Sequence, residues 1–196
     1  LKTPLASLQL QAECLREDLG SSSAHSPLVE RLVSDANRLS IQLENSLYLA
    51  EDENRQLLIE EVSLSDVINS VRGYWPDLNI MIPNNCAVNV DLRAFESILK
   101  NIIQNSVTHG QAKEVQIIAS DIGDDRCRLE ISDDGVGYKG VGNSLGDQFS
   151  RHYSGSGNGI GLFLCWRLIK KMKGAMNFLS LKPKFIIVLE LPGKIV

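Results

Sequence analysis

Apolar residues recur along the first fifty positions with the spacing of two amphipathic helices. The first row advances by alternating steps of four and three residues: Leu1, Leu5, Leu8, Ala12, Leu15 and Leu19. The second row comprises Val29, Leu32, Ala36, Leu39, Leu43, Ser46 and Ala50. Such heptad spacing places side chains on one stripe of a helix. Because Gly20 and the turn-forming residues 21–27 separate the rows, the pattern predicts a helical hairpin.

A single hairpin has one apolar stripe on each helix and cannot cover both stripes by itself. Two hairpins that pair as a four-helix bundle would bury them. The pattern therefore predicts a homodimer.

From about residue 57 the pattern changes to short alternating stretches interrupted by helices. We expect strands at 57–62, 79–82, 87–90, 115–120, 128–132, 176–181 and 185–191. Helices are expected at 63–75, 92–107 and 160–172. Asp91 is the expected N-cap of the second of these helices. This order predicts an α+β fold with helices on one face of a mixed sheet.

Composition narrows the function classes. The 196 residues are 43% apolar and 22% charged, which allows a buried core. A net charge of −4 argues against a general nucleic-acid binder. The apolar runs are far shorter than the ~20 residues that span a bilayer. The four cysteines are widely spaced, so we expect reduced, mostly buried thiols rather than a zinc site or a disulfide framework.

Two glycine-rich motifs are the first candidates for chemistry. Asp133-Asp134-Gly135-Val136-Gly137 follows a predicted strand, and Gly157-Asn158-Gly159-Ile160-Gly161-Leu162 opens a predicted helix. Glycine lets the backbone approach a ligand, and a helix N-terminus attracts phosphate. The Asp133 carboxylate could accept a hydrogen bond from an exocyclic amine such as that of adenine. The alternative is that these glycines only make flexible loops.

Other phosphate-binding motifs fit less well. The chain contains no GxxxxGK[ST], and residues 135–140 match GxGxxG without the βαβ context that a dinucleotide site requires. This argues against a dinucleotide-binding or protein-kinase-type loop.

Asn101 and Asn105 lie four residues apart and so share one face of a predicted helix. An amide among apolar neighbours needs a polar partner. Mg²⁺, with phosphate oxygens completing its shell, would be such a partner. The alternative is that both are ordinary polar positions at the edge of the core.

Together these motifs resemble the Bergerat ATP-binding fold of the GHKL superfamily, over about residues 57–192. Residues 101–105 resemble its N box, 133–137 its G1 box, 157–162 its G2 box and 138–156 its ATP lid. The resemblance implies an α/β sandwich that binds ATP, with Mg²⁺ on Asn105. The nucleotide-binding residues that it implies are Asn101, Asn105, His109, Asp133, Gly135, Gly137, Gly157, Gly159, Ile160, Gly161 and Leu162.

The first residues indicate which branch of the superfamily this is. Leu1-Lys2-Thr3-Pro4-Leu5 resembles the end of the H box of bacterial two-component sensor histidine kinases. The resemblance implies a dimerisation and phosphotransfer hairpin at 1–55 and a catalytic ATP-binding domain at 56–196. It also implies phosphoryl transfer from ATP to a hairpin histidine and then to an aspartate of a response-regulator receiver domain, with Asn105 and Thr3 as catalytic residues. Thr3 would help position water for dephosphorylation of the regulator, or it is an ordinary surface hydroxyl.

The same resemblance suggests a cytoplasmic domain that touches neither membrane nor nucleic acid, in a parent protein anchored in the bacterial inner membrane. The acceptor histidine would lie before Leu1, so we expect that this chain cannot autophosphorylate. Thr108 stands where many relatives have a basic residue, and His109 either contacts nucleotide or ends the helix before Gly110. The rival hypotheses are a GHKL ATPase or nucleotide-dependent switch without phosphoryl transfer, and a module that serves only for dimerisation and docking.

Overall fold

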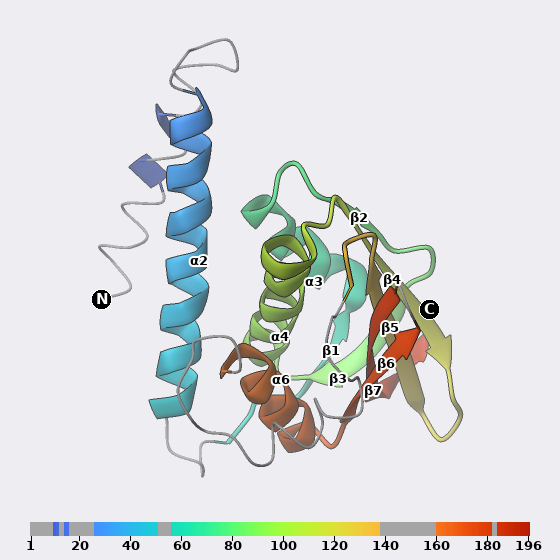
Figure 1. The fold of residues 1–196 in the computed structure, drawn as a ribbon. Helices are drawn as coiled ribbons and strands as arrows, with labels where there is room; N and C mark the ends of the chain where they lie inside the picture. Colours follow the sequence, from blue (N-terminus) through green and yellow to red (C-terminus); the bar gives the residue numbers. More distant parts are fainter. Residues whose placement is uncertain (1–9, 12–13, 16–25, 51–55, 138–159, 182–183) are drawn as a thin grey trace. The chain divides into compact units, whose positions relative to one another are not determined.

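The computed structural model describes residues 10–11, 14–15, 26–50, 56–137, 160–181 and 184–196. It divides into two compact units, Leu1–Glu51 and Asp52–Val196, which we describe separately (Figure 1).

The first unit contains the predicted second helix, α2 (Ser26–Ala50). The predicted first helix is helical at the described residues 10–11 and 14–15, and its remainder lies outside them. The predicted single stripe of α2 divides into two faces. Val29 and Ala36 are buried with Val33, whereas Leu32 and Leu39 are 46% and 53% exposed. This helix therefore presents a leucine row that the single chain leaves uncovered.

The second unit is built on a seven-stranded sheet. Its strands are β1 (Glu60–Ser63), β2 (Asn79–Met81), β3 (Cys86–Val90), β4 (Glu114–Asp121), β5 (Arg126–Asp133), β6 (Ala175–Leu181) and β7 (Lys184–Ile195). Their order is β1-β3-β7-β5-β4-β2, and β6 pairs with β7. Because β2 and β4 are parallel while the other pairs are antiparallel, the sheet is mixed, as predicted.

The helices of this unit gather on one side of the sheet (Figure 1). They are α3 (Leu64–Val71), a 3₁₀ turn (Arg72–Tyr74), α4 (Leu92–Asn105), a π-helical turn (Ser106–Gly110) and α6 (Ile160–Lys171). The α4 helix is central, and its apolar positions Phe95, Ile98, Leu99, Ile102 and Ile103 are fully buried. Asp91 caps it, as predicted, by accepting a 3.0 Å hydrogen bond from the Ala94 N–H. The predicted α+β class, with helices on one face of a mixed sheet, is confirmed.

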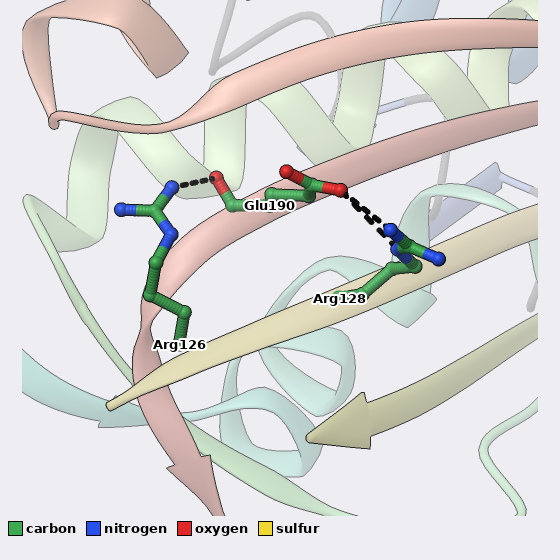
Figure 2. A network of polar contacts seen from close by, with 3 residues as sticks. All are labelled: Arg126, Arg128 and Glu190. Carbon is green, nitrogen blue, oxygen red and sulfur yellow. Dashed lines mark hydrogen bonds and ion pairs between the residues drawn. The ribbon is translucent and has the colours of Figure 1, made fainter. Parts of the chain in front are cut away.

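Alternation along the strands separates the core from the outer face. Val115, Ile117, Leu129 and Ile131 are buried, and the intervening positions are polar or partly exposed. On the outer face the Arg128 guanidinium lies 2.8 Å from the Glu190 carboxylate across the β5–β7 pair (Figure 2). The neighbouring Arg126 donates hydrogen bonds to the carbonyls of Glu190 and Lys173.

Several predicted boundaries were wrong, among them the end of the last strand, which extends to Ile195 rather than residue 191. The first strand begins at Glu60 rather than residue 57, and the helix expected to reach residue 75 ends at Val71 and continues as a 3₁₀ turn. The helix expected to reach residue 107 changes at Ser106 into the π-helical turn. There the Ser106 carbonyl accepts the N–H groups of both Gln111 and Ala112, and Gln111 adopts a left-handed φ of 54°.

The cysteines are free, and Cys86, Cys127 and Cys165 are buried as expected, while Cys14 is exposed. Burial, with a smaller effect of the neighbouring Cys127 thiol, raises the pKa of Cys86 to about 12. Within the described parts of the chain, none of the helices combines the length and hydrophobicity needed to cross a membrane.

Candidate functional site

The candidate site lies where the turn after β5 meets the end of α4. The Val136 N–H donates a 2.9 Å hydrogen bond to the Gly110 carbonyl. The Asp134 carboxylate accepts from the backbone N–H groups of Lys113 and Glu114 at 2.8 and 2.9 Å. The Glu114 and Lys113 bonds hold the pKa of Asp134 below its ordinary value. These bonds hold residues 133–137, the predicted G1 box, against residues 110–114, which follow α4 and its π-helical turn.

Asp133 is the last residue of β5, and each of its carboxylate oxygens has a donor within the protein. The Ser106 hydroxyl donates to Oδ2 at 2.8 Å, and the Gly135 N–H donates to Oδ1 at 3.0 Å. Gly110 lies against the same carboxylate, since a Cβ added there would be 3.2 Å from Oδ1. The carboxylate is therefore held in one orientation while retaining lone pairs for a further donor.

Gly135 and Gly137 have separate structural requirements. A Cβ at Gly135 would lie 2.3 Å from the Gly110 carbonyl oxygen, which excludes any side chain there. Gly137 has a φ of 69°, in the left-handed region that favours glycine. The first glycine permits a close approach of two backbones, and the second permits the direction of the turn.

The two asparagines of α4 differ in their surroundings. Asn101 is buried, and its amide donates a 2.9 Å hydrogen bond to the Ser97 carbonyl. Asn105 is half-buried, and its side chain makes no hydrogen bond to a described residue. Its carboxamide oxygen therefore has no partner among the described residues.

Two consecutive side-chain hydrogen bonds involve Gln104, the residue before Asn105. The Trp75 indole N–H donates to the Gln104 side chain at 3.2 Å, and the Gln104 amide donates to the Thr108 hydroxyl at 2.6 Å. His109 is exposed in the last helical turn before Gly110. His109 therefore lies at the helix end, while its contact with nucleotide stays a prediction.

The packing of α4 on α6 sets the position of the predicted G2 segment. The Asp91 N–H contacts the Met172 sulfur at 3.4 Å, and the Cys165 thiol lies 3.7 Å from the Ile98 carbonyl. From Asp91 to Ile98 the chain advances by seven residues, and from Met172 to Cys165 their partners go back by seven. The two helices are therefore antiparallel. Seven more residues along α4 reach Asn105, which places this residue at the end of the pair where α6 begins.

The remaining predicted residues divide between described and undescribed parts. Gly161 and Leu162 are partly exposed in the first turn of α6, which begins at Ile160. Gly157, Gly159 and Thr3 lie outside the described residues.

Sequence reasoning missed two residues of the site, Ser106 and Gly110. A serine after Asn105 has no distinctive spacing, and its contact with Asp133 joins residues 27 positions apart. The only available signal for Gly110 was a glycine at the end of a predicted helix.

Comparison with known proteins agrees with this arrangement. Residues 90–194 match the family described as "Histidine kinase-, DNA gyrase B-, and HSP90-like ATPase". The chain belongs to this ATPase family. The match includes α4, the π-helical turn, β5 with the turn after it, and α6, which together contain Asn105, Ser106, Asp133 and Gly135.

Relatives of this chain include sensor proteins. It is 24% identical to the sensor protein IrlS of Burkholderia pseudomallei in an alignment that covers 89% of this chain and 40% of that protein. It is 27% identical to the sensor histidine kinase TrcS of Mycobacterium tuberculosis in an alignment that covers 98% of this chain and 42% of that protein. The resemblance to sensor histidine kinases is confirmed, and the chain spans less than half the length of these relatives.

Solved structures show the same fold as this member of the ATPase family. Full-length ShkA in complex with AMPPNP superposes with a TM-score of 0.65 at 22% identity, covering 100% of this chain and 44% of that one. The catalytic domain of the histidine kinase ThkA superposes with a TM-score of 0.57 at 18% identity, covering 69% of this chain and 96% of that one.

Proposed function

We propose that this chain is the catalytic core of a two-component sensor histidine kinase, with a dimerisation hairpin at residues 1–55 and an ATP-binding domain at 56–196. The observation that carries the proposal is the Asp133 carboxylate, which accepts hydrogen bonds from Ser106 and Gly135. Asp133 is followed in the sequence by Gly135 and Gly137, the two glycines of the motif that resembles the G1 box. An acceptor held this way suits the exocyclic amine of adenine. Guanine offers a carbonyl oxygen at the corresponding ring position, which a carboxylate repels.

The residues present fit Mg²⁺ and phosphate at the other side of the site. Asn105 has an amide oxygen without a partner among the described residues, at the end of the helix pair where α6 begins. That helix N-terminus provides N–H groups and a positive dipole end for phosphate oxygens. Asn105 would hold the metal together with those oxygens. Mg²⁺ bound there would neutralise phosphate charge during phosphoryl transfer.

Further residues complete the proposal, and of these Gly157, Gly159 and Thr3 lie outside the described residues. Gly157 and Gly159 would let the backbone approach the phosphates, and His109 would contact the nucleotide. The phosphoryl acceptor would be a hairpin histidine of the longer protein, and the next acceptor an aspartate of a receiver domain. Thr3 would help position water for dephosphorylation of that regulator.

Dimerisation through the hairpin is supported by α2. Leu28, Leu32 and Leu39 are about half exposed in the single chain and recur at helical spacing on one side of the helix. Burying each leucine against a second hairpin would contribute about 1.5–3 kcal/mol. We place the dimer on the cytoplasmic side of a protein anchored in the inner membrane.

Nucleotide titration tests the proposal. The chain should bind ADP, and Mg²⁺ should strengthen the binding. Asp133→Asn should weaken ADP roughly ten- to hundredfold and affect GDP less, because a hydrogen bond to a charged group is lost. Asn105→Ala should remove the effect of Mg²⁺, while Asn69→Ala, an exposed asparagine of α3, should preserve it. A chain that binds no adenine nucleotide would refute the proposal.

The reaction is tested on the longer protein that contains this chain. Incubation with γ-labelled ATP should leave an acid-labile label on that protein, as expected of a phosphohistidine. Phosphate release without labelled protein would instead favour the ATPase or switch alternative.

A further inference from the structure

Ser106 is a buried hydroxyl, 8% exposed, at the start of the π-helical turn. Two acceptors lie near its single proton. The Asp133 Oδ2 atom is 2.8 Å away, and the Ile102 carbonyl oxygen is 3.4 Å away. Hydrogen bonds weaken with distance, and bonds to a carboxylate are the stronger kind, so the proton is donated to Asp133.

The backbone holds this serine firmly. Its carbonyl oxygen accepts the N–H groups of Gln111 and Ala112, which close the turn. A donor on a fixed backbone restricts the rotation of the carboxylate that it contacts. With the Gly135 N–H on the other oxygen, both ends of the Asp133 carboxylate are held. The lone pairs left over then point in fixed directions.

We infer that Ser106 is a positioning residue for Asp133, and that it sets the preference of the site for purines with an amine at the 6-position. The inference rests on the proposed nucleotide-binding function and extends it to a residue that does not itself touch the base. Without the hydroxyl, one oxygen of the partly buried carboxylate loses its donor. The carboxylate can then rotate away from the amine.

The experiment compares two nucleotides on the whole chain, each with Mg²⁺. ADP has the 6-amine, whereas purine riboside 5′-diphosphate lacks it and is otherwise the same. Ser106→Ala should weaken ADP about two- to tenfold, the effect of one hydrogen bond. It should leave the affinity for the analogue unchanged, because that ligand never uses the carboxylate as an acceptor.

Ser97→Ala is a matched control on the same helix. Ser97 is 2% exposed, and its hydroxyl has no hydrogen-bond partner among the described residues. The same change, removal of one buried hydroxyl, is therefore made without loss of a hydrogen bond. Both affinities should equal those of the parent chain.

A double-variant test isolates the coupling. In an Asp133→Asn background, the further change Ser106→Ala should cost ADP affinity less than in the parent, since the two residues act as one unit. Equal losses for ADP and the analogue, fully additive losses in the double variant, or unchanged ADP affinity in Ser106→Ala would each overturn the inference. If the parent favours ADP over the analogue and Ser106→Ala retains that ratio, the inference fails while the proposed function stands. A parent that binds neither nucleotide overturns both.

Discussion

The contact between Gly135 and Gly110 allows a prediction whose size follows from distances. A Cβ at Gly135 would lie 2.3 Å from the Gly110 carbonyl oxygen, 2.7 Å from its carbon and 2.8 Å from Asp133 Oδ1. Ordinary contact begins at 3.4 Å, so the carbonyl oxygen would have to retreat by roughly 1 Å. That movement would break its 2.9 Å hydrogen bond from Val136.

Gly135→Ala should therefore destabilise the second unit and impair binding. Overpacking costs about 1–3 kcal/mol and the lost hydrogen bond about 1 kcal/mol, so we expect a loss of about 2–4 kcal/mol in the free energy of unfolding. A shift of about 1 Å should break the proposed hydrogen bond between adenine and Asp133, which would weaken ADP roughly ten- to hundredfold. Both tryptophans, Trp75 and Trp166, belong to this unit, so fluorescence during urea unfolding follows it alone.

Two other glycines give a graded comparison. A Cβ at Gly110 would be 3.2 Å from the Asp133 side chain, which can yield, so Gly110→Ala should have a smaller effect on stability than Gly135→Ala. Gly73, in the 3₁₀ turn, has no atom within 4 Å of an added Cβ. Gly73→Ala should leave ADP affinity unchanged and stabilise by about 0.4–1 kcal/mol. If Gly135→Ala and Gly73→Ala behaved alike, the close approach of the two backbones would be refuted.

Three further predictions concern the remainder of the chain. Leu32→Glu with Leu39→Glu should shift sedimentation towards the monomer while ADP affinity stays unchanged; a variant as dimeric as the parent would exclude α2's leucine row from the interface. Arg128→Ala should lower stability by less than about 1 kcal/mol, because its ion pair with Glu190 is partly exposed, and the difference should shrink in 1 M salt. Under native conditions, mass spectrometry should find that iodoacetamide has modified Cys14 and left the buried residues Cys86, Cys127 and Cys165 unmodified. Addition of urea should make these three thiols reactive.

Local patterns predicted most elements because burial on one side imposes a period. The buried positions of α4 recur at helical spacing behind an aspartate cap, and those of β4 and β5 alternate, so both kinds of element were readable. The end of α4 was not readable. Whether a helix stops or widens at Ser106 depends on where the chain after Gln111 must go, which is a tertiary requirement.

The candidate site shows the same division. Asp133, Gly135 and Asn105 were found because a family motif contains them. Ser106 was not found, since its hydrogen bond depends on the π-helical turn and on the position of β5. The two faces of α2 were also unpredicted, because heptad spacing alone does not say which neighbours cover a helix.

Asp91 caps α4, and its other contacts connect the start of that helix to two further parts of the second unit. Its carboxylate holds the Leu58 N–H as well as that of Ala94, and its own N–H meets the Met172 sulfur. The chain therefore enters the second unit through a point shared by the start of α4 and the end of α6. A pull on residue 58 acts on both helices, whose opposite ends provide Asn105 and the first turn of α6.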